Sequence, residues 1–546
     1  MPSDESDKNS YTESVRIFPD TMAESASEDS ELRLSHLRSY DEVAYLEHEE
    51  ETPLGRHIGV FGVVMMIVQR IIGSGIFAVS GSIYKDVGGS PFLFFLVWIC
   101  AGYMSFAGIF CFLELGSIVP RSGGMKVFLE YVYYKPRMMM TVVFGIYSLL
   151  FGFVITNAII FGEYTLYALG FDDVSSQAPK QIGMLFVLCT CVVNGVSAHL
   201  GVKIQNFVGV IKLVLLFLMA LSGIWVLLFP VSITHIENNL HLSEFFTIKR
   251  EVTVGSFSSA LLKGIFSFGG WQTAQVVANE IQDPVKTMNI AAPLALSIIN
   301  VCYFFINLSY LVVIPDGDLD KLQEMVGSIL MEKLFGYTIG RQLLTLTVAI
   351  SAAGNIMTVL YHISRMNQEI FREGFLPFSR FFASNHPFGS PMRCLIFPVA
   401  ISSIFLLIHT PDNVYNYVID LDGYPLQMFV GLTCFGIFVL RRRRPNLKPS
   451  FRANSIHVVF VSVFSLFMFI GPLNPFSKST EFTGFPNYAY VALIVLFSCF
   501  LYWLVLFRIL PTIGGYEMEQ ATITLSDGLT MKKWCKESEY ENVDGV

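Results

Sequence analysis

The chain has 546 residues, of which 53% are hydrophobic and only 15% are Asp, Glu, Lys or Arg. Soluble proteins average about 25% charged residues, so this composition excludes an ordinary soluble protein. The formal net charge of -8 comes mostly from tails and loops, and it gives no indication of nucleic-acid binding.

The first 55 residues are polar and rich in Ser, Asp and Glu. They carry too little apolar surface to fold alone, so we expect a disordered tail over residues 1–55. This segment lacks a cleavable apolar signal, and the first span is therefore expected to insert the chain and leave its N-terminus in the cytosol.

Apolar stretches of about 20 residues then recur, and each is long enough to cross roughly 30 Å of hydrocarbon as an α-helix. The twelve predicted spans are residues 58–83, 92–113, 140–169, 182–198, 205–229, 255–279, 291–314, 340–366, 394–409, 424–440, 456–471 and 488–510. The sequence therefore predicts an all-α integral membrane domain over residues 56–510, followed by a polar cytosolic tail over residues 511–546.

Basic residues gather in alternate loops, which the positive-inside rule assigns to the cytosol. They are Arg121, Lys126, Lys135, Arg137, Lys203, Lys286, Arg372, Arg380, Arg393, the run Arg441 to Arg444, Lys448 and Arg452. The opposite loops are acidic or mixed, so both termini are predicted to be cytosolic.

The first span contains Gly73-Ser74-Gly75 near mid-membrane. Glycine weakens a helix and frees backbone groups, so we predict that the helix breaks here. The half-helix that restarts near Gly75 would present unpaired N–H groups and the positive end of its dipole to a carboxylate, and Ser74 would add a hydroxyl. Because Gly-x-Gly is a weak motif, a small-residue packing contact between helices is the alternative.

The sixth span contains a second interruption, Gly269-Gly270, at a comparable depth. Broken helices in corresponding positions of two halves are typical of the midplane site of a transporter. Carbonyl groups near Ile71, Phe266 and Gly269 could accept hydrogen bonds from an ammonium, while the amides from Gly73 onward hold a carboxylate. The zwitterion of an α-amino acid satisfies both ends.

Three aromatic residues flank this second break, Phe266, Phe268 and Trp271. At the predicted site they would form a wall or a gate. Each of them taken singly is also compatible with ordinary packing.

Arg70, Lys212 and Lys263 lie inside predicted spans, where an ionisable residue is a functional candidate. Burial favours the neutral form of a lysine, so Lys212 could load and release a proton during transport. The alternative for Lys212 is that its side chain extends to the cytosolic interface, and for Lys263 the same reading is favoured at the outer interface. The sequence does not identify a partner for Arg70.

Catalytic and metal chemistry are not indicated. Seven of the nine cysteines lie inside apolar runs, where a thiol packs as a small hydrophobe, and no disulfide framework, metal site or cofactor is expected. The histidines are scattered, and none sits with an acid and a nucleophile deep in one span, which argues against a membrane enzyme.

Five segments in order along the chain resemble the amino acid–polyamine–organocation transporters. They are Gly73 to Phe77, Glu114 to Gly124, Phe266 to Trp271, Asn279 to Pro284 and Arg372 to Pro377. The resemblance implies an inverted-repeat fold of five plus five helices, with helices one and six broken and two further helices.

The resemblance also implies roles for individual residues. Ser74 and Gly75 would bind the substrate carboxylate, and Phe266 would be the outer gate. Asn355 would line the pocket. Lys212 falls where proton-dependent members place a lysine over the sodium site of sodium-coupled relatives, which favours proton symport.

Within this family the chain is most similar to the branch of fungal methionine permeases. Arg70, three residues before Gly73, and the segments 123–136 and 372–392 carry this likeness. It implies import of methionine, with cysteine and other neutral amino acids as further candidates, across the plasma membrane. The loop at 170–181 lacks the cysteine with which animal relatives bind a heavy chain, so no such partner is implied.

The same resemblance makes Lys8, the only lysine of the N-terminal tail, the first candidate for ubiquitin attachment. The acidic cluster from Asp41 to Glu51 could dock a ubiquitin-ligase adaptor. Alternatively, these acids only keep the tail solvated. A non-transporting amino acid receptor remains the competing function, although the short tails show no recognisable output domain.

Overall fold

The computed structural model describes residues 45–47, 55–73, 75–171, 177–315, 317, 326–407, 414–473 and 487–536. Lys8, Ser74 and nearly all of the N-terminal tail lie outside these residues, so what the sequence predicts for them stays a prediction.

The described chain is mostly helical, and nine of its helical segments are long and apolar enough to cross a membrane. Their elements are α5 (Pro91–Ile118), α7 (Met139–Phe151) with α8 (Ile155–Ala168), α9 (Gln177–Val196), α10 (Ala198–Leu228), α13 (Pro284–Val313), α16 (Tyr337–Arg372), α19 (Val414–Arg443), α20 (Ser455–Ile470) and α21 (Tyr488–Leu504). The chain therefore has the architecture of a multi-pass membrane protein.

Shorter elements connect and extend these helices. They are η1 (Tyr45–Glu47), α4 (Ser80–Asp86), α6 (Met125–Val132), α11 (Val231–Thr234), η2 (Leu242–Glu244), α15 (Val326–Phe335), α17 (Ser379–Ala383), η4 (Met392–Leu395), α18 (Ile396–Leu407), η5 (Gly471–Leu473), η6 (Val505–Ile509) and α22 (Leu510–Gly514).

Two helices are interrupted at the predicted glycines. The first consists of α2 (Val60–Ile71) and α3 (Gly75–Ala78), and the second consists of α12 (Val254–Ser267) and η3 (Trp271–Glu280). Gly270 has a φ of 111°, a backbone conformation that side-chain-bearing residues rarely adopt, and it ends the helical path after α12. The sequence thus locates both breaks from their local glycines.

A third interruption, between α7 and α8, is not predicted by the sequence. The predicted span 140–169 leaves the helical path at residues 152–154, where Gly152 caps α7. This interruption places Phe153 and Val154 in the lining of a cavity.

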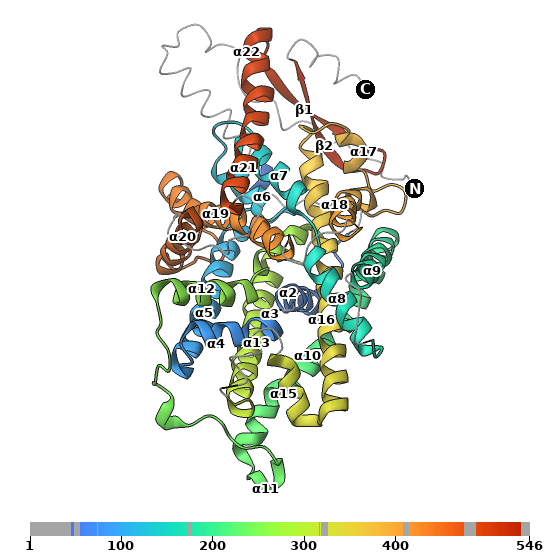
Figure 1. Ribbon diagram of the computed structural model, residues 1–546. Helices are drawn as coiled ribbons and strands as arrows, with labels where there is room; N and C mark the ends of the chain where they lie inside the picture. The colour runs from blue at the N-terminus through green and yellow to red at the C-terminus, as the bar shows by residue number, and fades with distance from the viewer. Residues whose placement is uncertain are drawn as a thin grey trace, which may run out of the picture. The chain divides into compact units, whose positions relative to one another are not determined.

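Helix α2 is central to the packing. It contacts α10, α13, α16 and η3, and Figure 1 shows it among α13, α16 and α10 near the middle of the helical body. Eight of its twelve residues are buried hydrophobic or glycine residues, and Gln69 is buried as well. A helix that is apolar on every face is typical of a position inside a membrane protein bundle.

The C-terminal segment forms an antiparallel hairpin of β1 (Met518–Thr524) and β2 (Thr530–Lys536). Lys532 Nζ of this hairpin contacts Glu130 at 3.1 Å and Glu373 at 2.8 Å, and Lys126 also pairs with both carboxylates. Burial alone would raise the pKa of Glu373, but the two lysines lower this pKa to about 2. The hairpin is therefore anchored to α6 and to the end of α16 by buried ion pairs.

Candidate functional site

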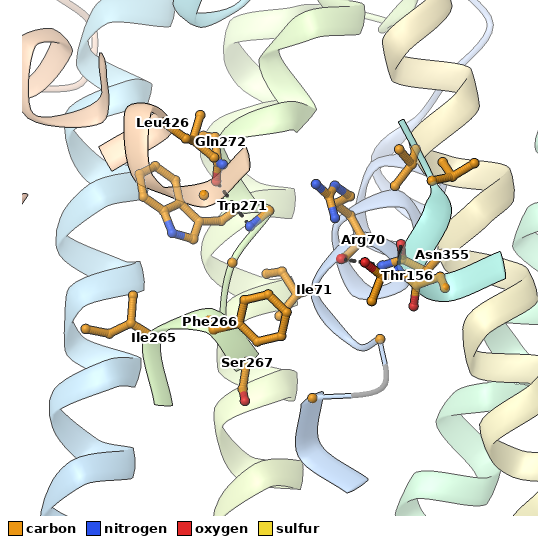
Figure 2. A pocket seen from close by; sticks show the side chains of 18 of the residues that line it. Arg70, Ile71, Thr156, Ile265, Phe266, Ser267, Trp271, Gln272, Asn355 and Leu426 are labelled. Atoms are coloured by element: carbon orange, nitrogen blue, oxygen red, sulfur yellow. Dashed lines mark hydrogen bonds between the residues drawn. The ribbon is translucent and has the colours of Figure 1, made fainter. Parts of the chain in front are cut away.

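A cavity of about 210 Å³ lies where the two helix interruptions meet (Figure 2). Most of the residues selected from the sequence line it. These are Arg70, Ile71, Gly73, Gly75, Phe266, Gly269, Gly270, Trp271 and Asn355. The structure therefore brings together two segments that lie almost 200 residues apart in the chain.

Side chains of α16 hold the end of α2 at the first break. Asn355 Nδ2 donates to the carbonyl oxygens of Arg70 at 2.8 Å and Gln69 at 3.2 Å. Ser351 Oγ lies 3.2 Å from the carbonyl oxygen of Ile72 and 3.0 Å from that of Gly73. Carbonyls that the interrupted helix leaves without intrahelical donors thus obtain donors from a neighbouring helix.

Lys212 of α10 is completely buried behind the first break, outside the lining of the cavity. Its Nζ donates to Gln69 Oε1 at 3.1 Å, to the Ser351 carbonyl at 3.1 Å and to the Ile72 carbonyl. The alternative in which this side chain extends to the membrane interface is therefore wrong. The lysine head group instead links α10, α2 and α16.

The second break is held mainly by its own turn. The Gly269 amide donates to the Phe266 carbonyl at 3.0 Å, and the Thr273 hydroxyl donates to the Gly270 carbonyl at 2.8 Å. From another helix, Tyr303 of α13 donates to the Ser267 carbonyl at 3.1 Å. A carbonyl oxygen has two lone pairs, so the Phe266 carbonyl can still accept a bond from a ligand.

The two breaks touch each other at their glycines. A Cβ atom on Gly75 would lie 3.0 Å from Ser267 Oγ and 3.2 Å from Ser267 Cα. A Cβ atom on Gly270 would lie 2.7 Å from Arg70 Cγ. Both glycines thus permit a close approach of the two segments, which is the packing role considered as an alternative for Gly75.

The aromatic residues of the second break have different surroundings. Phe266 is 52% exposed and projects into the cavity, as Figure 2 shows. Trp271 also lines the cavity but is only 6% exposed, while Phe268 is buried against Trp98 and Tyr303. Phe266 is therefore the most exposed of the three at the cavity, and Phe268 belongs to the core.

Further lining residues were not identified from the sequence. They include Met104, Phe153, Thr156, Asn157, Gln272, Leu426, Gln427 and Val430. These residues come from α5, from α8 and the bend before it, from η3 and from α19. Apart from Gln272, they lie far in sequence from both glycine motifs. A polar amide side chain inside an apolar stretch, such as Asn157, is the sequence feature that could have indicated them.

The orientation of the Asn157 amide follows from its neighbours. Because Asn355 Nδ2 donates to two carbonyl groups, its Oδ1 must accept, and Asn157 Nδ2 donates to it at 3.1 Å. Asn157 Oδ1 is buried without a hydrogen-bond partner in the described structure and faces Gly73. The cavity therefore has an available acceptor next to the first break.

Beyond the cavity, the start of α2 and the end of η3 are joined to each other and to α16. Glu280 Oε1 lies 2.7 Å from Arg365 Nε, and the same carboxylate accepts from Tyr361. The amides of His57 and Ile58 donate to the Glu280 carbonyl at 3.0 and 2.9 Å. These bonds tie the halves of both interrupted helices on that side.

Lys263 forms an ion pair within the protein. Its Nζ lies 2.6 Å from Asp86 Oδ2 and also contacts the Ser82 hydroxyl. Both partners are on α4, which follows α3 in the chain, so this contact links α12 to the segment that continues the first interrupted helix. Among the described residues, no group of three His, Cys, Asp or Glu side chains is placed to hold a metal ion.

A multi-pass helical protein with a small, partly polar cavity between two interrupted helices has the architecture of a membrane transporter. Residues 58–500 match the amino acid permease family, and the chain belongs to this family. It is a transporter of amino acids and not an enzyme.

Three relatives illustrate this membership. The chain is 38% identical over 490 residues to the low-affinity methionine permease of Saccharomyces cerevisiae, covering 89% of each protein. It is 26% identical over 488 residues to the high-affinity methionine permease of that yeast, covering 88% of this chain and 84% of the relative. It is also 26% identical over 414 residues to the serine/threonine exchanger SteT of Bacillus subtilis, covering 74% of this chain and 87% of the relative.

Proposed function

We propose that this permease imports methionine and that the amino acid binds in the cavity between the two interrupted helices. The main support is the meeting of both breaks at one cavity, together with the 38% identity to a methionine permease over most of the chain. Cysteine and other neutral amino acids are secondary candidates.

The decisive experiment is uptake of radiolabelled methionine in cells that lack other methionine carriers. Unlabelled methionine should compete best, followed by cysteine and other neutral amino acids. Saturable uptake of a different amino acid, unaffected by excess methionine, would contradict the assignment.

In the proposed binding mode, the substrate carboxylate lies at residues 73–75, against the backbone amides of Ser74 and Gly75, while the Gly73 amide donates to the Ile71 carbonyl at 2.9 Å. The start of α3 contributes only modestly by its dipole, because the helix has four residues. The ammonium would be held by the carbonyls of Ile71, Phe266 and Gly269, with Gly270 allowing close approach. Phe266 and Trp271 would close over the bound substrate, and Asn355 would fix the first break.

We further propose that transport is coupled to protons through Lys212, with Arg70 as an auxiliary charge. A protonated Lys212 has three N–H donors and faces carbonyl and amide oxygens of α2 and α16, so its charged form would stabilise the first break. Each charge carried inward would gain roughly 2.3 kcal/mol per 100 mV of membrane potential.

This coupling predicts that a protonophore abolishes concentrative uptake, while replacement of sodium has little effect. Vesicles with an imposed pH gradient should accumulate methionine without sodium. Unchanged accumulation after protonophore treatment would contradict proton symport.

The topology belongs to the same proposal. Nine apolar helices, the pairs α2–α3 and α12–η3, and the short segment Met392–Leu406 together make twelve spans. We propose five plus five of these as inverted repeats within a transporter domain over residues 56–510, flanked by cytosolic tails over 1–55 and 511–546 and located in the plasma membrane. Epitope tags at both ends should be accessible to antibody only after the cells are permeabilised.

For turnover, we propose that Lys8 accepts ubiquitin from a ligase whose adaptor docks on the acidic N-terminal cluster. The C-terminal lysines are the competing acceptors, but Lys532 is held by Glu130 and Glu373 in the folded hairpin. Lys8→Arg should therefore retain the permease at the surface after methionine is added, whereas a variant with Lys532, Lys533 and Lys536 all changed to Arg should be internalised like wild type. The reverse result would move the acceptor to the C-terminal tail.

A further inference from the structure

Gly108 lies in the middle of α5 and is buried. A methyl group at this position would overlap Trp271 atoms Cζ2 and Cη2 and would lie 3.1 Å from Trp271 Cε2. The backbone at Gly108 is ordinary α-helix, so the conformation itself does not require glycine. The Trp271 indole therefore occupies the space that a side chain at position 108 would need.

The neighbours of the indole limit where it can move. Phe112, one helical turn after Gly108, packs edge to face against it with ring centroids 5.1 Å apart. Met104, one turn before Gly108, lines the cavity. Residues four apart lie on the same face of a helix, so the indole lies along one face of α5.

The cavity is the adjacent space that can receive the ring. Trp271 is one of its lining residues, on the opposite side of the view from Arg70 and Asn355 in Figure 2. Protein interiors are packed at close to crystal density, so a larger residue at position 108 must displace the indole toward that open volume. Since the cavity measures only about 210 Å³, such a displacement removes a substantial part of it.

We propose that Gly108 determines how long a substrate side chain the permease accepts, by letting the Trp271 indole lie back against α5. Gly108 does so as a positioning residue, because it acts through Trp271. The inference rests on the proposed binding of an amino acid in this cavity, with both charged ends at the helix breaks and the side chain directed toward Trp271 and Leu426.

A series of unbranched amino acids tests this inference. The purified full-length protein is titrated with alanine, 2-aminobutyrate, norvaline, norleucine and methionine, and Kd is obtained from the increase in thermal stability that each ligand causes. In Gly108→Ala, the preference for methionine over alanine should fall at least about 10-fold, the usual effect of one methylene in an apolar pocket. Trp271→Phe should shift the preference toward the longer members of the series.

Gly264→Ala is the matched control. Gly264 is also a buried helical glycine facing α5, but its added methyl group would lie 3.2 Å from Val97 and 3.3 Å from Ala101, outside the cavity lining. It should keep the wild-type order of affinities.

A Gly108→Ala profile that runs parallel to the wild-type profile would overturn the inference. Should this variant not be recovered folded, Trp271→Phe decides: a shift toward longer side chains supports the inference, and an unchanged profile overturns it. A wild-type protein that binds none of the five amino acids contradicts the proposed function itself, and this inference with it.

Discussion

The two helix breaks that face the cavity are stabilised in different ways. The first break receives hydrogen bonds from Ser351 and Asn355 of α16 and from Lys212 of α10. The second break is closed mainly by its own amides and hydroxyls, with Tyr303 of α13 as its donor from another helix. One break is thus fixed to its surroundings, and the other depends on local turns.

This difference suggests separate roles for the two breaks in the proposed binding mode. In that mode, the fixed break would provide a preorganised position for one end of the substrate, which lowers the entropy lost on binding. The second break would change its position when the ligand adds hydrogen bonds to it, and Phe266 would move with it. A ligand that bridges the two segments would therefore shift the balance between open and closed states by its differential contacts.

The largest effect is expected where the two breaks touch. Gly75→Val places a β-branched side chain 3.0 Å from Ser267 Oγ and close to the Ser267 backbone, so the two segments must separate. We expect methionine uptake to fall by more than about 100-fold, the equivalent of roughly 2.7 kcal/mol. Surface amount and uptake are measured in the same cells.

Gly471→Val is the control for this substitution, because a Cβ atom on Gly471 meets no other atom within 4 Å. Near-normal uptake by Gly75→Val at a normal surface level would show that the close contact is dispensable.

Removing the charge behind the first break should have the next largest effect. Lys212→Met keeps the length of the side chain but leaves the oxygens of Gln69, Ile72 and Ser351 without this donor. The Ile72 carbonyl keeps the Ser351 hydroxyl as a donor, so the loss falls mainly on the Gln69 amide oxygen. An unsatisfied buried acceptor costs about 1–3 kcal/mol, so the purified variant should unfold several degrees lower. Uptake should also lose its dependence on external pH, and a variant that retains wild-type pH dependence would argue against Lys212 as the coupling residue.

A smaller loss is expected for Asn355→Leu, which removes the donors to the Gln69 and Arg70 carbonyls. Two lost hydrogen bonds correspond to about 1–3 kcal/mol, and uptake should fall about 10-fold. Thr358→Val in the same helix is the control, because within the described part of the chain the Thr358 hydroxyl donates to the Gly354 carbonyl of α16 itself. Equal uptake by the two variants would mean that the first break does not need its cross-helix donors.

The smallest effects provide the sharpest comparison between the breaks. Tyr303 and Tyr310 are both buried in α13; Tyr303 donates to Ser267 of the second break, and Tyr310 donates to Ile76 of the first interrupted helix. Because the first break has several other donors, Tyr303→Phe should cost about 1 kcal/mol and Tyr310→Phe less. Thermal unfolding of both purified variants measures the difference, and a larger effect of Tyr310→Phe would reverse the proposed order.

The sequence predicts the breaks well because glycine acts locally. Gly73, Gly75, Gly269 and Gly270 weaken their own helices, so their positions carry the signal without knowledge of the fold. The partners of the breaks could not be predicted in this way. Ser351 bonds to residues almost 280 positions earlier in the chain, and only tertiary packing makes that contact.

Local signals were also missed. Asp527-Gly528 lies between β1 and β2, and Gly528 has a φ of 83°. An Asp-Gly pair between two segments of alternating apolar and polar residues is typical of a β-hairpin, so the sequence is sufficient to predict these strands. For the interruption at 152–154, the sequence offers a single glycine, Gly152. One glycine in an apolar stretch does not predict a helix break.

Substrate binding between the two helix breaks is tested most directly by an electron cryomicroscopy structure of the full-length permease with bound L-methionine. We expect ligand density in the cavity, with the carboxylate against residues 73–75, the ammonium near the carbonyls of Phe266 and Gly269, and the thioether toward Trp271 and Leu426. Methionine bound in the reverse orientation, or at a site outside this cavity, would contradict the proposed binding mode.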